Sequence, residues 1–149
     1  MINFALVGCG RISKRHGELL GENQIAGAQL VAVCDKVISK AKVLSDKYSI
    51  PAYACLHEMM KMEKIDVVVV LTESGLHAQH TIELAPYGAH VVVEKPMALT
   101  LDDADSMIEA CDEHGVKLFV VKQNRFNVPI VQLRKALKQG RFGKLIMGT

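Results

Sequence analysis

The 149-residue sequence contains no tryptophan, and aromatic residues make up only 5% of it. It therefore offers few rings on which the bases of a single-stranded nucleic acid could stack. Its formal charge is only +2, from 18 Lys and Arg against 16 Asp and Glu, whereas nucleic-acid-binding domains are strongly basic. We therefore expect no nucleic-acid partner.

Closely spaced cysteines are also absent, because Cys9, Cys34, Cys55 and Cys111 include no C-x-x-C pair. This wide spacing excludes zinc-ribbon and thioredoxin-like motifs. Cys9, Cys34 and Cys55 lie in or beside apolar runs, which is typical of reduced, buried thiols. The pattern predicts a protein of the reducing cytoplasm.

The sequence has no apolar run long enough to cross a bilayer, since runs such as residues 67–71 fall far short of the roughly 20 residues required. It also begins directly with a strand-like segment, residues 2–7, without the basic region and cleavage site of a signal peptide. We expect neither a membrane partner nor a secretory leader.

Half of the residues are hydrophobic, which is enough for a packed core in one domain of ordinary size. Thr100 is expected to cap the helix predicted at residues 100–115, and Val43 and Leu44 are expected to face inward from the helix predicted at residues 37–48. Apolar runs of strand length alternate with segments of helical spacing, and this alternation predicts an α/β fold: a Rossmann-type, doubly wound parallel sheet of about six strands with helices on both faces. Strands are predicted at residues 2–7, 30–34, 52–54, 66–71, 90–93 and 118–121, and helices at 11–20, 37–48, 56–62, 76–87, 100–115 and 131–137.

The end of the sequence suggests a further domain. Gly140 is expected to end the last helix, and residues 143–149 are expected to begin another strand. Because an apolar strand without a partner is an unfavourable edge, we expect residues 1–142 to form one domain and residues 143–149 to open a second. The alternative is a strand that returns to the same sheet or pairs between two chains.

A glycine-rich turn follows the first predicted strand and reads Gly8-Cys9-Gly10-Arg11-Ile12-Ser13, a G-x-G-x-x-S pattern. In dinucleotide-binding folds the first glycine allows the tight turn, and the second lets the backbone approach a pyrophosphate at a helix N-terminus. The small Ser13 replaces the third glycine. The place of the turn between a strand and a helix supports this interpretation. A P-loop is excluded, because no lysine follows a glycine in the required frame.

Asp35 ends the second predicted strand, 25 residues after Gly10, near the place where such folds carry an acid that hydrogen-bonds the adenosine ribose. Its carboxylate would repel a 2′-phosphate, which favours NAD over NADP. Lys36 argues the other way, because a cation there accepts a phosphate. Two alternatives stay open: a plain turn residue at Asp35, and a methyltransferase, which also has a glycine-rich first turn and an acid after its second strand.

Polar residues follow three later strands. The clusters are Thr72-Glu73-Ser74-Gly75-Leu76-His77, Glu94-Lys95-Pro96 and Gln123-Asn124-Arg125. Because ligands of open parallel sheets bind beyond the carboxyl ends of the strands, the three clusters are expected to line one cleft.

Lys95 is the candidate for acid–base chemistry, because a lysine in a crowded pocket can exchange a proton with a substrate hydroxyl. The alternative is a surface lysine paired with Glu94. His77 and His80 lie three residues apart and share a helix face, a spacing that fits either a metal site or a polar helix start at His77 with a surface histidine at His80. We expect no metal, because the sequence offers no evident third ligand.

In this order the motifs resemble the glucose-fructose oxidoreductase, inositol dehydrogenase and rhizopine-catabolism (Gfo/Idh/MocA) family, over essentially the whole chain. The E-K-P motif after a strand of this kind is quite specific. Thr72-Glu73-Ser74-Gly75 departs from the commoner Thr-Pro form of that loop. Together with residues 121–127, this variant is similar to the bacterial UDP-N-acetylglucosaminuronic acid 3-dehydrogenases, which serve surface-polysaccharide synthesis.

The resemblance implies roles for particular residues. Lys95 is implied to be the catalytic lysine, near the sugar carbon that loses hydride. Asn124 and Arg125 are implied to face the cofactor or the substrate, where Arg125 can bind an anionic group through two hydrogen bonds. The implied cofactor-binding residues are Gly8, Gly10, Arg11 and Ile12 for the pyrophosphate, Asp35 for the adenosine ribose, and Thr72, Ser74, His77, Glu94 and Gln123 for the nicotinamide side.

The resemblance also implies a function: hydride transfer to NAD from a sugar, here a UDP-linked N-acetylated uronic acid oxidised at C3. Family members carry a second α/β domain that supplies a histidine, most substrate contacts and the interface of a homo-oligomer. The present chain is therefore expected to bind NAD and to be inactive alone. A non-catalytic module that binds or senses a dinucleotide is the alternative.

Overall fold

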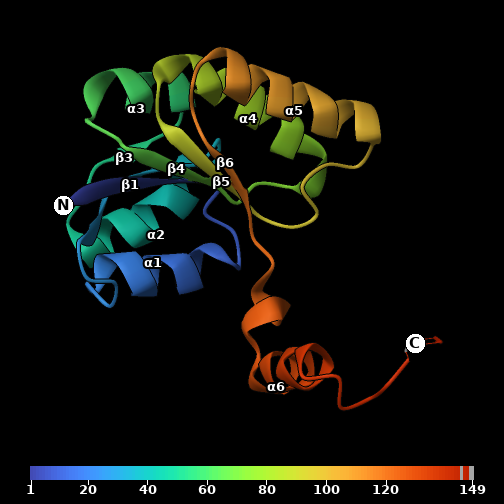
Figure 1. Ribbon diagram of the computed structural model, residues 1–149. Coiled ribbons are helices and arrows are strands. Elements are labelled where there is room, and N and C mark those ends of the chain that lie inside the picture. The colour runs from blue at the N-terminus through green and yellow to red at the C-terminus, as the bar shows by residue number, and fades with distance from the viewer. Residues whose placement is uncertain (145, 148–149) are drawn as a thin grey trace.

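A computed structural model describes residues 1–144, 146 and 147, and its central feature is a parallel sheet (Figure 1). Neighbouring strands pair in parallel in the order β3-β2-β1-β4-β5-β6. This order is that of the doubly wound dinucleotide-binding fold, so the predicted fold class is confirmed. Within the described residues the strands are β1 (Ile2–Val7), β2 (Ala28–Cys34), β3 (Ala52–Tyr53), β4 (Val67–Val70), β5 (His90–Val93) and β6 (Leu118–Val120).

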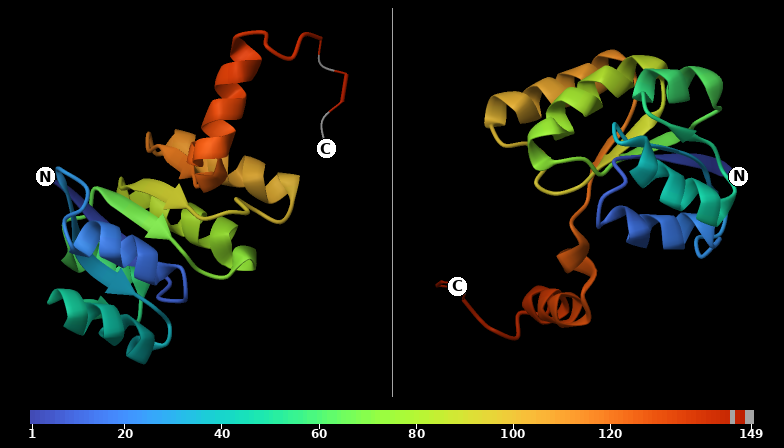
Figure 2. Two further views of the ribbon diagram at one scale, coloured as in Figure 1. Left: turned by 90° about the horizontal axis from the view of Figure 1, so that it is seen from below. Right: turned by 180° about the vertical axis from the view of Figure 1, so that it is seen from behind.

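Helices cover both faces of this sheet. Figures 1 and 2 show α1 and α2 on one face and α3, α4 and α5 on the other. The helices are α1 (Ser13–Gly21), α2 (Ile38–Tyr48), α3 (Leu56–Met62), α4 (His77–Leu84), α5 (Leu101–Glu113) and α6 (Val128–Lys138), and the short 3₁₀ helices are η1 (Ser74–Leu76), η2 (Ala85–Tyr87) and η3 (Gln123–Phe126).

The core has two halves because successive strand residues point to opposite faces of the sheet. On β4, Val68 and Val70 pack in the cluster that includes Met107 of α5. Val69, between them in sequence, packs in the cluster that includes Leu44 of α2. A strand buried on both faces needs an apolar side chain at every position, which explains the unbroken run of valines.

The start of α5 follows local sequence signals. The Thr100 hydroxyl oxygen accepts a hydrogen bond from the Asp103 N–H at 3.1 Å, which confirms Thr100 as the N-cap. Asp102 and Asp103 lie in the first turn, where the partial positive charge of the helix N-terminus stabilises carboxylates.

Four free thiols are distributed between core and surface. Cys34 is buried and Cys9 is half-buried, in line with the expectation for these two thiols, and Cys111 is buried as well. The expectation was wrong for Cys55, which is exposed. Cys55 lies at the turn between the edge strand β3 and α3, beyond which the described residues form no further strand of the sheet.

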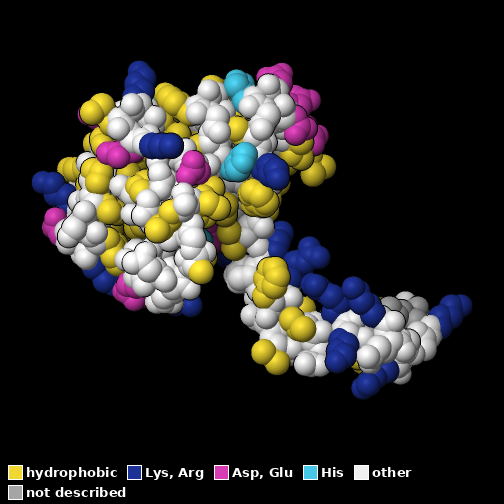
Figure 3. Space-filling view, turned by 60° about the vertical axis from the view of Figure 1, so that its left-hand side comes forward, with side chains coloured by type: hydrophobic (Ala, Val, Ile, Leu, Met, Phe, Trp, Pro, Cys, Tyr) yellow, Lys and Arg dark blue, Asp and Glu magenta, His cyan; other side chains and the backbone are white. Residues whose placement is uncertain are grey.

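The chain leaves the sheet after β6, and α6 stands apart from the other helices (Figure 2). Apolar side chains of α6 such as Val128, Val131 and Leu133 are exposed. Figure 3 shows Lys and Arg side chains along this arm, the part of the chain that follows β6. No helix among the described residues combines the length and apolar character needed to cross a membrane.

The segment predicted to open a second domain is described only in part. Gly143, Lys144, Ile146 and Met147 belong to no strand, since no neighbouring strand lies beside them among the described residues. Leu145, Gly148 and Thr149 lie outside the described residues. The boundary at residue 143 therefore stays a prediction.

Neighbouring residues of α2 provide a test of the core. Leu44 is 4% exposed, whereas Val43, which was expected to face inward, is 62% exposed. We predict that Leu44→Ala lowers the free energy of unfolding by about 2–5 kcal/mol, through lost apolar burial and a residual cavity. Val43→Ala should change it by less than about 0.5 kcal/mol. Urea unfolding followed by circular dichroism measures both values, and equal losses would contradict the orientation of α2.

Candidate functional site

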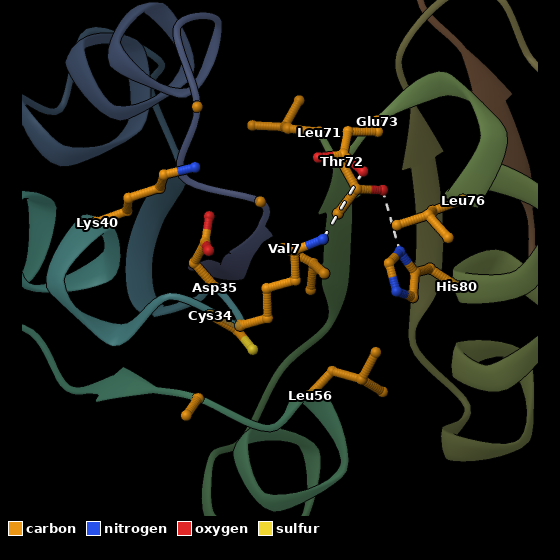
Figure 4. Close-up of a pocket in the computed structure, with 14 residues that line it drawn as sticks. Val7, Cys34, Asp35, Lys40, Leu56, Leu71, Thr72, Glu73, Leu76 and His80 are labelled. Carbon is orange, nitrogen blue, oxygen red and sulfur yellow. Dashed lines mark hydrogen bonds and ion pairs between the residues drawn. The ribbon is translucent and has the colours of Figure 1, made fainter.

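A cavity of about 270 Å³ lies at the carboxyl ends of β1, β2 and β4 (Figure 4). This is where the order of the strands reverses, because β1 lies between β2 and β4, and open α/β sheets bind ligands at such a point. Its polar lining is Gly8, Gly10, Asp35, Lys36, Lys40, Thr72, Glu73 and His80, and its apolar lining is Val7, Cys34, Ala54, Leu56, Leu71 and Leu76.

The two glycines of the turn are required for different reasons. Gly8 has a φ of +96°, and a Cβ there would lie 2.7 Å from the Leu71 carbonyl carbon and 2.8 Å from the Thr72 nitrogen. The fold itself therefore requires glycine at this position. A Cβ at Gly10 would meet no heavy atom within 4 Å. The space beside Gly10 is open toward the cavity, so glycine there allows a ligand to approach the backbone.

Asp35 is fixed in place by the backbone around it. Its Oδ2 accepts a hydrogen bond from the Cys9 N–H, and its Oδ1 accepts one from the Val37 N–H, each at 2.8 Å. Because a carboxylate oxygen can accept more than one hydrogen bond, both oxygens can still accept from ligand hydroxyls. Asp35 therefore organises the glycine turn and lines the cavity at the same time.

The third position of the turn, Ser13, is 1% exposed, and its hydroxyl donates to the Gly10 carbonyl oxygen at 2.6 Å. This bond fixes the start of α1.

Burial chiefly raises the pKa of the Cys9 and Cys34 thiols to about 12. Both therefore stay protonated and leave the charge of the cavity to its Asp, Glu and Lys side chains.

His80 lines the cavity instead of lying on the surface as the sequence suggested. Its Nδ1 lies 3.0 Å from the Thr72 hydroxyl oxygen. Burial lowers the pKa of His80, and the charges of His77 and Lys36 lower it too, whereas Glu83 raises it. The balance favours a neutral imidazole. A signal was available in the spacing, because residues 77, 80 and 84 share the α4 face that packs on the sheet.

His77 lies beneath the loops and does not line the cavity. It is 1% exposed, with Nδ1 2.7 Å from the Pro96 carbonyl oxygen and Nε2 3.0 Å from the Thr72 carbonyl oxygen. Both ring nitrogens are thus occupied by the backbone, and His77 joins the loops after β4 and β5. Within the described residues, no three His, Cys, Asp or Glu side chains lie close enough to hold a metal ion.

A second polar group lies at the end of β5. Glu94 is 8% exposed; its Oε1 lies 3.2 Å from His16 Nε2, and its Oε2 accepts from the Lys95 N–H at 3.1 Å. Sequence reasoning missed His16, which lies on α1 one turn after Ser13. The Lys95 side chain is exposed, and the peptide bond to Pro96 is cis. The Glu94 carboxylate contacts His16 and the Lys95 backbone N–H. Among the described residues it forms no ion pair with the Lys95 side chain, so that part of the alternative expected from the sequence is wrong.

The predicted binding residues thus fall into two groups. Gly8, Gly10, Asp35 and Thr72 line the cavity. The rest lie outside it, and the arm that follows β6 carries three of them in η3, all exposed. Those outside are Arg11, Ile12, Ser74, His77, Glu94, Lys95, Gln123, Asn124 and Arg125.

Comparison with known proteins identifies relatives of this chain. Residues 2–122 match the sequence model of an oxidoreductase family described as having an NAD-binding Rossmann fold, Gfo/Idh/MocA. The chain is 30% identical to inositol 2-dehydrogenase of Salmonella typhimurium over 149 residues, which is 98% of this chain and 44% of that protein. It is 32% identical to D-apiose dehydrogenase of Paraburkholderia graminis over 97% of this chain and 38% of that protein.

Among solved structures, the chain is similar to the WlbA dehydrogenase from Bordetella pertussis in complex with NADH and UDP-GlcNAcA. The TM-score is 0.91 and the identity 43%, over 96% of this chain and 43% of that one. The chain therefore spans less than half the length of the relatives that it matches.

The lowered pKa of His80 predicts a pH dependence of stability. The unfolded chain binds a proton at His80 as the pH falls through about 6.5, whereas the folded chain binds it only at lower pH. The contribution of His80 is therefore complete above pH 6.5 and is lost as the pH falls toward the folded value. We predict that His80→Asn, which keeps a partner for Thr72 but does not titrate, weakens the loss of stability between pH 7.5 and 5.5. Urea unfolding at both values measures this, and identical slopes in the two proteins would contradict the buried placement.

Proposed function

Because this chain belongs to the Gfo/Idh/MocA family of oxidoreductases with an NAD-binding Rossmann fold, we propose that it is the cofactor domain of an enzyme that moves a hydride from a sugar to NAD. The observation that carries this proposal is the open space beside Gly10, next to the fixed carboxylate of Asp35. A pyrophosphate needs the first and a ribose diol the second.

We infer that the cavity takes the adenosine half of the dinucleotide. The glycine turn and Asp35 line it, and its remaining walls include Ala54, Leu56 and Leu76, which suit a flat, weakly polar base. The residues proposed for the nicotinamide side, such as Ser74, Glu94 and Gln123, lie outside it. The nicotinamide half is therefore proposed to extend toward the end of β5.

For the substrate we propose a UDP-linked N-acetylated uronic acid oxidised at C3. This chain is 43% identical to the WlbA dehydrogenase, whose structure was solved in complex with UDP-GlcNAcA. It is only 30% identical to inositol 2-dehydrogenase, so the comparison supports a UDP-sugar over an inositol. Such a substrate carries several negative charges, and Arg125 and Asn124 on η3 are exposed and proposed to bind it. The proposed place of this chemistry is the cytoplasm.

Lys95 is proposed as the catalytic acid–base residue. NAD supplies the acceptor for the hydride that leaves the sugar carbon. The hydroxyl on that carbon must lose its proton as the carbonyl forms, and a neutral Lys95 amine would receive it. Its exposed side chain at the end of β5, beside the Glu94–His16 pair, is free to reach a substrate.

We also propose that residues 143–149 begin a second α/β domain that supplies substrate contacts and the interface of a homo-oligomer. The relatives extend well beyond the matched part, since the chain covers 43% of the WlbA chain. The exposed apolar side chains of α6 support a further packing partner. The isolated chain is then expected to bind NAD without turnover.

Substitutions at the two glycines test the cofactor site. Gly10→Ala places a methyl group in open space, so stability should be unchanged or slightly higher, while NADH binding should weaken at least about tenfold, or about 1.4 kcal/mol. Gly8→Ala is the contrast: it should lower both stability and binding, because its Cβ meets the Leu71 backbone. Titration calorimetry with NADH and thermal unfolding measure the two effects. Wild-type NADH affinity in Gly10→Ala would refute this site.

Substitution of Lys95 separates an enzyme from a non-catalytic binding module. In the full-length protein, Lys95→Met should leave NADH affinity within about twofold and lower kcat by at least about a hundredfold, the usual range for loss of an acid–base group. Steady-state kinetics with the UDP-sugar and a parallel NADH titration measure both quantities. An unchanged kcat would remove Lys95 from the chemistry.

A further inference from the structure

An ion pair joins two sides of the cavity. The Lys36 ammonium, just after β2, lies 3.7 Å from Oε2 of Glu73, which follows β4. Both residues line the cavity, and their side chains are 72% and 76% exposed. The pair therefore lies at the rim, and its contribution to stability is small. Its effect on the binding of a charged ligand does not depend on that contribution to stability.

The charges around this cavity balance. Asp35 and Glu73 are its carboxylates, and Lys36 and Lys40 are its cations. Two backbone N–H groups hold the Asp35 carboxylate in place. Lys36 is the next residue, and its flexible side chain could reach a group bound at Asp35. Glu73 offers it a different partner across the cavity.

A 2′-phosphate on the adenosine ribose would be sensitive to this arrangement. It adds a charge of about −1.5 to −2 close to the ribose diol, and hence close to Asp35 if the cofactor binds as proposed. A free Lys36 ammonium would offset the repulsion by Asp35. While Glu73 pairs with Lys36, that compensation is lost, and the Glu73 carboxylate adds repulsion of its own.

We propose that Glu73 is a specificity-determining residue, which excludes dinucleotides with a 2′-phosphate by holding Lys36 in an ion pair. The inference rests on the proposed function, because it assumes that the adenosine half lies in this cavity. In the sequence, Asp35 favours NAD and Lys36 favours NADP. The ion pair explains why Lys36 need not favour NADP, because the cation next to Asp35 is engaged by a carboxylate from another strand end. Asp35 and Glu73 thus act together, the first directly and the second through Lys36.

A double-mutant cycle tests the proposal. NADH and NADPH are titrated into the wild-type chain, Glu73→Gln, Lys36→Gln and the double variant. Glu73→Gln should raise NADPH affinity about two- to fivefold, the range that an exposed ion pair contributes. It should leave NADH affinity at the wild-type value. In the double variant the gain should disappear, because it depends on Lys36. The gain should also shrink at high salt, since exposed charges are screened.

Glu22→Gln is the matched control, because Glu22 forms an exposed ion pair with Lys47 at 3.0 Å and does not line the cavity. It removes the same charge and should leave the NADPH-to-NADH affinity ratio unchanged. A wild-type ratio in Glu73→Gln, or a gain that persists without Lys36, would overturn the proposal while leaving the cofactor site intact. Failure of the wild-type chain to bind NADH would overturn the proposed function as well.

Discussion

The Asp35 carboxylate is the interaction on which the geometry of the site depends. It ties the end of β2 to the glycine turn through the Cys9 N–H, and to the start of α2 through the Val37 N–H. Three chain segments thus meet at one side chain. The Gly8 N–H adds a bond to the Cys34 carbonyl oxygen at 2.8 Å, which keeps the turn against β2. The open face of Gly10 is presented to the cavity because these bonds hold the turn in place.

Around this centre, the fold separates groups that maintain structure from groups left free for a ligand. His77 has both ring nitrogens occupied by carbonyl oxygens, and Gly8 is demanded by the neighbouring Leu71 and Thr72 backbone. The Cβ position of Gly10 and the side chain of Lys95 have no such role among the described residues: the first faces open space, and the second is exposed. Groups without a structural reason are those expected to bind or react.

The sequence predicted the parts of this protein that local patterns determine. The bounds of α3 and β5 agree with the structure, because apolar runs and helical spacing are local. Gly8, Gly10 and Asp35, which the same local patterns singled out, line the cavity. Val43 was misplaced because adjacent helical residues point about 100° apart, so it and the buried Leu44 cannot both face the sheet.

The remaining features depend on packing between distant segments, which no local pattern contains. His16 and Glu94 are 78 residues apart in sequence, yet their side chains meet. The pairing of Lys36 with Glu73 depends on two different strand ends lying across one cavity. His80 looked like a surface residue until α4 was placed against the end of β4. Such contacts follow from the order of the strands rather than from a motif.

The most direct test of this account is a competition titration on the chain with the two halves of the cofactor. If the cavity takes the adenosine half, ADP-ribose binds and displaces NADH, whereas reduced nicotinamide mononucleotide does not displace bound ADP-ribose. Failure of ADP-ribose to bind, or competition by the mononucleotide for the same site, would contradict the assignment of the cavity to the adenosine half.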